Sequence, residues 1–135
     1  MRYLLDTNII SDLVRNPGGA VAQRIAEIGH VNVLTSIIVA SELRFGAAKK
    51  ASPKLTARVD GILKRFSVMP FEAPADMYYG SMRAALESQG QTISENDLLI
   101  ASHAITLGCT LVTANEREFA RIDGLTFENW LQPRS

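Results

Sequence analysis

Carboxylate and amide side chains occur where apolar segments of this chain meet a turn or a helix start. Asp6 follows the apolar run at residues 3–5, and Asn115 follows a second such run. Glu42 and Asp97 lie within apolar segments that have helical spacing. An ionised carboxylate removed from water needs a compensating partner, and most of these positions have no obvious Lys or Arg beside them. A divalent cation held by oxygen ligands is the simplest compensation.

Each of these residues also has a purely structural explanation. Asp6 could cap a helix, and Glu42 could form a buried salt bridge with a nearby basic residue such as Arg44 or Lys49. Residues 94–97 and 115–118 both match the capping-box pattern. Four such coincidences in one small domain are less probable together than one shared site. We therefore treat these positions as candidate catalytic residues: Asp6, Glu42, Asp97, Asn115 and Glu118.

The hydrophobic pattern predicts strands that alternate with helices. Short apolar runs predict strands at residues 2–5, 31–36, 66–71, 110–113 and 125–127. Helical spacing predicts helices at residues 7–14, 21–28, 37–50, 53–65, 74–86, 94–107 and 116–122. This alternation predicts an α/β fold with a mostly parallel central sheet. No repeat or linker divides the chain, so residues 1–135 are expected to form a single domain.

The predicted topology brings the candidate residues to one edge of the sheet. In parallel sheets, ligands bind at the carboxyl ends of the strands. Asp6 and Asn115 are placed directly after strands, while Glu42 and Asp97 are on helices that start from the same edge. A cluster of carboxylate and amide oxygens suits Mg²⁺ or Mn²⁺ better than zinc. Such a cation can activate a water molecule and neutralise a phosphate oxygen during an in-line displacement.

Other polar residues are candidates for contacts with a substrate. The hydroxyls of Thr7 and Thr113 could orient a ligand or a water molecule, whereas strand-end hydrogen bonding better explains Ser36. A basic stretch from Arg44 to Arg65 could contact a phosphate backbone. A solvated helical face explains the same stretch equally well. The candidate substrate contacts are Thr7, Thr113, Arg44, Lys49 and Lys50.

Length and composition limit the possible functions. A chain of 135 residues can bury a real core, and its 14 basic and 14 acidic residues give no net charge. The single cysteine, Cys109, excludes an internal disulfide and a cysteine-based zinc site. His30 and His103 lack ligand spacing and are predicted to be structural. No apolar run approaches a membrane span and no secretion signal is evident, which predicts a cytoplasmic protein.

Four stretches, in their order along the chain, resemble the motifs of PIN-domain ribonucleases. The resemblance is greatest to the VapC toxins of bacterial toxin–antitoxin pairs, and it covers nearly the whole chain. The matching stretches are LLDTN at residues 4–8, SELRFGA at 41–47, NDLLIA at 96–101, and LVTAN at 111–115 followed by Glu118-Phe119. Any one of these stretches alone would be weak, but together they are specific.

The resemblance implies a three-layer α/β/α fold and cleavage of RNA that depends on Mg²⁺ or Mn²⁺. It implies a homodimer, and a small VapB-type antitoxin that forms a higher hetero-oligomer with the toxin and places its tail in the active-site groove. Asp6, Glu42 and Asp97 match the metal-binding carboxylates of the family. Asn115 stands where many members have a fourth Asp, and Glu118 could supply the missing charge.

The resemblance also narrows the expected substrate. Some close relatives cut the anticodon stem-loop of initiator tRNA, and others cut different tRNAs or a ribosomal RNA loop. The expected function is therefore an endoribonuclease toxin that acts on RNA, with tRNA as the first candidate. The alternative is a catalytically weak PIN subunit that serves as a binding module in a DNA-binding toxin–antitoxin complex, because the fourth Asp is missing.

Overall fold

Five parallel strands form the centre of the fold in a computed structural model that describes residues 1–131. The strand order is β3-β2-β1-β4-β5, and all four strand pairs are parallel. This confirms the prediction of a mostly parallel sheet. Positions 132–135 of the predicted domain lie outside the described residues. The strands are β1 (Tyr3–Leu5), β2 (Val33–Ser36), β3 (Ser67–Met69), β4 (Thr110–Val112) and β5 (Phe127–Glu128).

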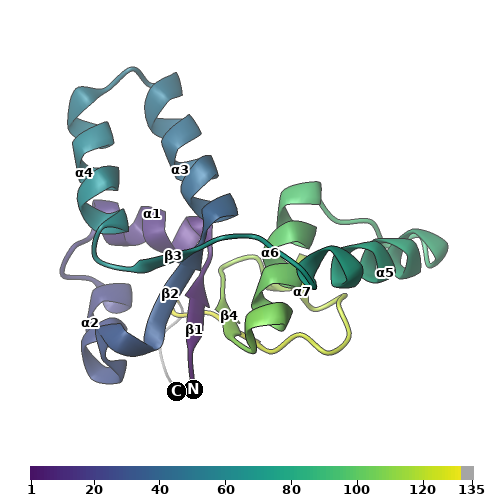
Figure 1. The fold of residues 1–135 in the computed structure, drawn as a ribbon. Coiled ribbons are helices and arrows are strands. Elements are labelled where there is room, and N and C mark those ends of the chain that lie inside the picture. The colour runs from purple at the N-terminus through teal and green to yellow at the C-terminus, as the bar shows by residue number, and fades with distance from the viewer. Residues whose placement is uncertain (132–135) are drawn as a thin grey trace.

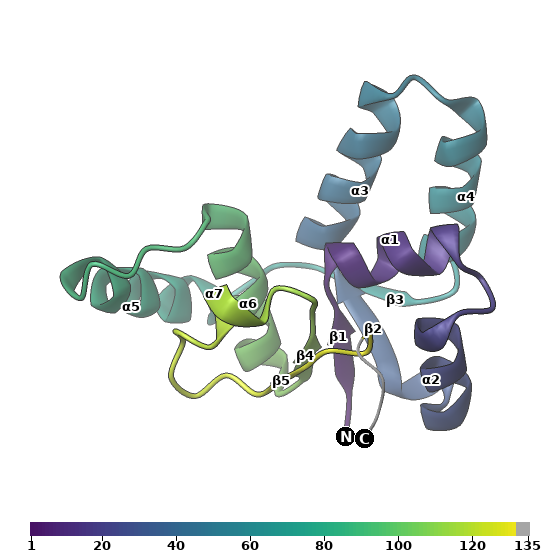
Figure 2. The same cartoon turned by 180° about the vertical axis from the view of Figure 1, so that it is seen from behind.

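Helices lie on both sides of this sheet and complete a three-layer α/β/α arrangement. In Figures 1 and 2, α5, α6 and α7 gather on one side, and the hairpin of α3 and α4 extends past the carboxyl edge of the sheet, next to α1. No helix within residues 1–131 has the length and apolar character needed to cross a membrane. The helices are α1 (Thr7–Arg15), α2 (Ala20–Ile28), α3 (Ile37–Lys49), α4 (Pro53–Leu63), α5 (Ala75–Ser88), α6 (Glu95–Leu107) and α7 (Glu116–Phe119).

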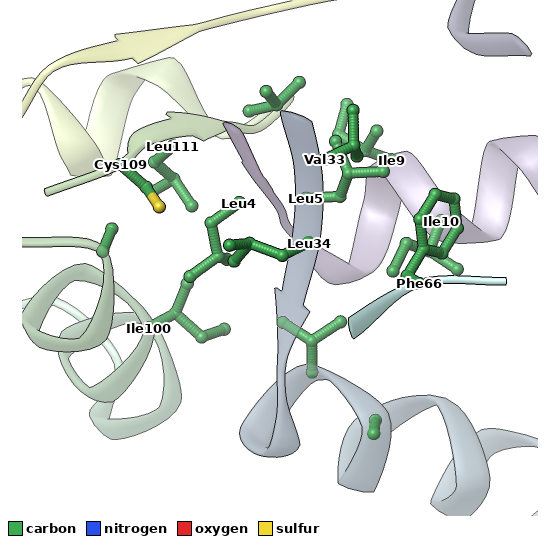
Figure 3. Close-up of a cluster of buried hydrophobic side chains, with 14 of the residues drawn as sticks. Leu4, Leu5, Ile9, Ile10, Val33, Leu34, Phe66, Ile100, Cys109 and Leu111 are labelled. Atoms are coloured by element: carbon green, nitrogen blue, oxygen red, sulfur yellow. The ribbon is translucent and has the colours of Figure 1, made fainter. Parts of the chain in front are cut away.

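The core is built around the central strands β1 and β4, which are buried on both faces. Leu4 and Leu5 are fully buried, as are Leu111 and Val112. Side chains alternate across a strand, so Leu4 points toward α6 and Leu5 points toward α1 (Figure 3). Burial on both faces is typical of parallel sheets and explains why these strands are continuous apolar runs.

Several element boundaries differ from the prediction. The strand predicted at residues 31–36 begins at Val33, because residues 30–32 form a short 3-10 turn. The last short helix ends at Phe119 instead of residue 122, and the last strand is Phe127–Glu128. Short elements at the end of a sheet have few local signals, so their bounds depend on tertiary pairing.

Two helices that begin at the carboxyl edge of the sheet start with a serine cap. The Ser36 hydroxyl accepts a hydrogen bond from the backbone N–H of Ile38 at the start of α3. The Ser94 hydroxyl accepts one from the backbone N–H of Asp97 at the start of α6. These bonds satisfy N–H groups that have no partner within the helix. The caps thereby fix where α3 and α6 leave the sheet edge.

We predict opposite effects of one substitution at two helix glycines. Gly108 ends α6 in the left-handed region, with φ of +67°. Gly108→Ala should therefore lower the free energy of unfolding by about 1 kcal/mol. Gly80 lies inside α5, where an added Cβ meets nothing within 4 Å. Gly80→Ala should raise the same quantity by roughly 0.5–1 kcal/mol. Urea denaturation would measure both changes in the free energy of unfolding. Two changes of the same sign would contradict this difference in backbone conformation.

Candidate active site

Asp6 lies at the carboxyl end of the central strand β1. The residue is 3% exposed, and it is the only buried Asp or Glu within residues 1–131. The backbone N–H of Thr7 donates to Oδ1 at 2.7 Å, and the Thr113 hydroxyl donates to Oδ2 at 2.7 Å. Burial raises the pKa of Asp6, and these hydrogen bonds oppose the rise only in part. Asp6 thus has the capping role offered as its structural explanation, and within residues 1–131 no salt bridge compensates its charge.

Glu42 extends from α3 toward Asp6. The Thr7 hydroxyl donates to Glu42 Oε1 at 2.7 Å, and the Asn96 side-chain amide donates to Oε2 at 3.2 Å. The charge of Glu42 contributes to the raised pKa of Asp6. Within residues 1–131, no salt bridge joins Glu42 to a basic side chain. The alternative explanation of Glu42 as a buried ion pair is therefore wrong.

Asn115 connects the two remaining carboxylates. Its side-chain amide donates to Asp97 Oδ2 at 3.0 Å and to Glu118 Oε2 at 2.8 Å. The capping box predicted at residues 115–118 is wrong, because the Asn115 side chain makes no cap bond to α7. The backbone N–H of Asn115 donates instead to the Thr113 hydroxyl at 3.0 Å. The segment that follows β4 thus places Thr113 in hydrogen-bonding contact with Asp6, and Asn115 with Asp97.

Asp97 and Glu118 interact, and the interaction raises the pKa of Asp97 and lowers that of Glu118. Burial raises the pKa of Asp97 to about 7, helped by its hydrogen bond to Glu118 and by the negative charges of Asp6 and Glu118. The hydrogen bond from Asp97 lowers the pKa of Glu118, and Asn115 and the charge of Arg121 add to this effect. Raised pKa values at Asp6 and Asp97 indicate negative charge that the protein does not neutralise by itself.

The donor chemistry of this cluster fits a hard divalent cation. All of its acidic groups are carboxylates, which suit Mg²⁺ or Mn²⁺. Within residues 1–131, no three His, Cys, Asp or Glu side chains form a ready-made metal-binding group. The four carboxylates interact instead as two pairs, Asp6 with Glu42 and Asp97 with Glu118. The charge of Asp6 connects the pairs, because it also raises the pKa of Asp97. The raised pKa values are the observation that favours a cation between them.

Only some of the candidate substrate contacts lie at the site. Thr7 and Lys50 line a groove of about 310 Å³ that begins at the site. Arg44 lies away from that groove and forms a salt bridge with Asp60. The Lys49 ammonium lies 5.9 Å from the centroid of the Phe45 ring. The basic stretch is therefore not one continuous surface, because only some of its members face the site.

Two contacts at the site had no role in the sequence prediction. Asn96 holds Glu42, and its only signal was a polar residue beside Asp97 in the first turn of α6. The Ser36 hydroxyl lies 2.7 Å from His103 Nδ1, which links the start of α3 to α6. His103 is buried, and its burial lowers its pKa. This agrees with the structural role predicted for His103, between the two helices that carry Glu42 and Asp97.

We predict that the metal-free protein becomes less stable as the pH rises toward neutrality. The pKa of Asp97 is about 7 in the folded protein, against an ordinary value of 3.8. Between these values the folded state binds a proton that the unfolded state has lost, so stability falls as the pH rises. Asp97→Asn should flatten this dependence. Melting curves in EDTA at about pH 5 and about pH 8 would measure it.

The control for this experiment is Asp76→Asn, which removes an exposed carboxylate at the start of α5. The control should show the same pH dependence as the unmodified protein. If Asp97→Asn also leaves the pH dependence unchanged, the raised pKa of Asp97 is contradicted.

Comparison with known proteins places this arrangement in a family. The PIN domain family matches residues 3–125. The chain is 39% identical over 132 residues to Ribonuclease VapC2 of Rickettsia felis, covering 96% of this chain and 98% of that protein. It is 34% identical over 131 residues to the tRNA(fMet)-specific endonuclease VapC of Shigella flexneri, covering 96% and 98%.

Solved structures show the same fold. The chain is similar to VapBC2 from Rickettsia felis bound to a promoter DNA fragment, with a TM-score of 0.89, 39% identity, and coverage of 96% and 99% of the two chains. It is also similar to DNA-bound VapBC from Salmonella typhimurium, with a TM-score of 0.90, 32% identity, and coverage of 96% and 98%. Together with the carboxylate cluster at the end of β1, these similarities show that the chain belongs to the PIN-domain family, among the VapC ribonucleases.

Proposed function

We propose that this protein is a metal-dependent endoribonuclease toxin that hydrolyses RNA phosphodiester bonds and is inhibited by a VapB-type antitoxin. The observation that carries the proposal is the convergence of four carboxylates at one sheet edge without a salt bridge to any of them within residues 1–131. A cluster of this kind attracts a divalent cation, and the cation attracts phosphate. The relatives named as ribonucleases support RNA as the substrate class.

In this proposal Asp6, Glu42 and Asp97 hold Mg²⁺ or Mn²⁺. When bound, the cation supplies a lowered pKa for an attacking water and neutralises charge on the phosphate. Thr113 and Thr7 orient the oxygens of Asp6, because each donates to a different one. Thr7 and Asn96 likewise orient Glu42, which positions the water. Asn115 keeps Asp97 and Glu118 together and replaces a fourth carboxylate with a neutral donor.

The reaction is hydrolysis by an external water molecule. The water oxygen forms a bond to phosphorus while the bond from phosphorus to the 3′ oxygen breaks, and that oxygen leaves with a proton. The products are therefore a 3′-hydroxyl end and a 5′-phosphate end. A 2′,3′-cyclic phosphate would instead mean that the 2′-hydroxyl of the RNA had attacked.

For the substrate we propose tRNA, with the anticodon stem-loop of initiator tRNA as the first candidate. The support is the relative named as a tRNA(fMet)-specific endonuclease, which is 34% identical along nearly its whole length. For the partner we propose a VapB-type antitoxin, because similar solved structures are VapBC complexes. We further propose a cytoplasmic homodimer that joins the antitoxin in a larger assembly.

We predict that Asp97→Asn abolishes RNA cleavage and leaves the fold intact. The substitution keeps the shape of the side chain but removes a carboxylate that the cation needs. Antitoxin-free protein would be incubated with total cellular RNA in Mg²⁺, in Mn²⁺ and in EDTA, and the cut ends would be mapped by sequencing. Cleavage should require a metal and should occur at discrete positions.

Asp76→Asn, on the exposed start of α5, is the matched control and should cleave normally. If the unmodified protein leaves all RNA intact with either metal, the ribonuclease proposal fails. The chain would then be better explained as a binding module within a DNA-binding complex.

We also predict that Thr113→Val weakens metal binding by roughly 10–100-fold, since it removes the hydroxyl that orients Asp6. Thr113→Ser retains the hydroxyl and should restore most of the affinity. Isothermal titration with Mn²⁺ would measure both variants. Equal affinities for the valine and serine variants would show that the hydroxyl does not position Asp6.

A further inference from the structure

A second feature of the same face is a pair of grooves that meet along α1. The first groove, of about 310 Å³, starts at Thr7 and Glu42 in the candidate active site. The second, of about 300 Å³, lies between the end of α1 and the second half of α4. Both grooves are lined by Val14 and Arg15. The two grooves are therefore neighbours at the end of α1, and the second lies farther from the carboxylates than the first.

Basic side chains line the two grooves beyond the active site. We call Lys50, Arg15, Arg58 and Arg65 the basic groove. Lys50 and Arg15 line the first part, and Arg15, Arg58 and Arg65 line the second. All four are exposed. No salt bridge within residues 1–131 involves any of them.

The acidic charge of the two grooves is confined to the active-site end of the first. Among the residues that line the two grooves, Glu42 is the only carboxylate. The lining of the two grooves therefore changes from acidic, where a cation would bind, to basic, where a polyanion would be attracted. Arg44 contributes nothing to this change, since Asp60 already neutralises it.

An exposed glycine lies between two arginines of the second groove. Arg58 lies on α4 and Arg65 follows its end, and both line this groove together with Gly61. A Cβ at Gly61 would meet nothing within 4 Å. The backbone here is accessible between two guanidinium groups, each of which can bind a phosphate oxygen pair.

We propose that the basic groove is a path for the RNA strand, whose phosphates contact Lys50, Arg15, Arg58 and Arg65 beyond the carboxylates. This inference rests on the proposed ribonuclease function and assigns it a substrate path. The occupant is a polyanion because the two grooves together are lined by four cations, none of which forms a salt bridge within residues 1–131.

The test compares two double variants with the same loss of charge. Arg58→Gln with Arg65→Gln removes two cations from the basic groove. Lys54→Gln with Lys64→Gln removes two exposed cations from the same part of the chain that line neither groove. Both would be made in the Asp97→Asn background, and binding of bulk tRNA would be measured by filter retention over a series of salt concentrations. Melting curves would confirm that each variant folds.

The groove variant should bind bulk tRNA roughly tenfold more weakly at low salt, and its log affinity should depend on log salt concentration with a slope smaller by about 1.4. The lysine variant should bind like its parent. Equal weakening in both variants would overturn the proposal, since general surface charge would then be sufficient. Unchanged tRNA binding in the groove variant, with loss of antitoxin binding instead, would also overturn it and assign the groove to a peptide.

Cleavage separates this inference from the proposed function. Protein with an intact Asp97 would be incubated with bulk tRNA and Mn²⁺. If it cuts the tRNA and the groove variant cuts it equally well, the proposed RNA path is wrong while the ribonuclease function stands. If protein with an unaltered sequence cuts neither bulk tRNA nor total RNA, the ribonuclease function itself fails.

Discussion

Burial and mutual repulsion of carboxylates at the end of β1 set the main energetic constraint at this sheet edge. Asp6 is buried at the end of a strand that must itself be apolar, because both of its faces are covered. Burial raises the cost of ionising Asp6 and Asp97, and the charge of Glu42 on Asp6 and those of Asp6 and Glu118 on Asp97 add to it. Without stabilising contacts, this repulsion would favour separation of the helices that carry these groups.

The scaffold opposes that repulsion with neutral hydrogen-bond donors. Thr7 contacts both Asp6 and Glu42, Thr113 contacts Asp6, and Asn115 connects Asp97 to Glu118. Neutral donors orient carboxylate oxygens without cancelling their charge, so the cluster keeps its affinity for a cation. A lysine or arginine in the same place would form a salt bridge and remove that affinity. The hydrogen bond between Ser36 and His103 adds a rigid link behind the site, between α3 and α6.

Salt bridges distinguish two groups of basic residues on the molecule. Arg24, Arg44 and Arg83 form salt bridges with acidic neighbours, so their charge is already neutralised. The cations of the basic groove have no such partners within residues 1–131. A protein with no net charge can in this way present a local positive surface beside a local negative one. Charge at the level of the whole chain would not reveal either surface.

The alternation of strands and helices, the parallel sheet, and the positions of Asp6, Glu42, Asp97 and Asn115 at its edge could be predicted from the sequence. These follow from local patterns: apolar runs, helical spacing, and serine or glycine at helix ends. Which of these groups are in contact depends on the packing of distant segments. Asp6 meets Thr113 across 107 positions, Glu42 meets Thr7 across 35 and Asn96 across 54.

Predictions from local sequence patterns were wrong where one pattern is compatible with two different structures. Residues 94–97 and 115–118 both match a capping box, yet only Ser94 caps its helix with its side chain, while Asn115 turns toward Asp97. The basic residues from Arg44 to Arg65 also differ in their contacts. Packing of α3 on α4 pairs Arg44 with Asp60, whereas Arg58 lines a groove together with Arg15. Such choices depend on distant neighbours and on burial, which the spacing of residues along a chain does not encode.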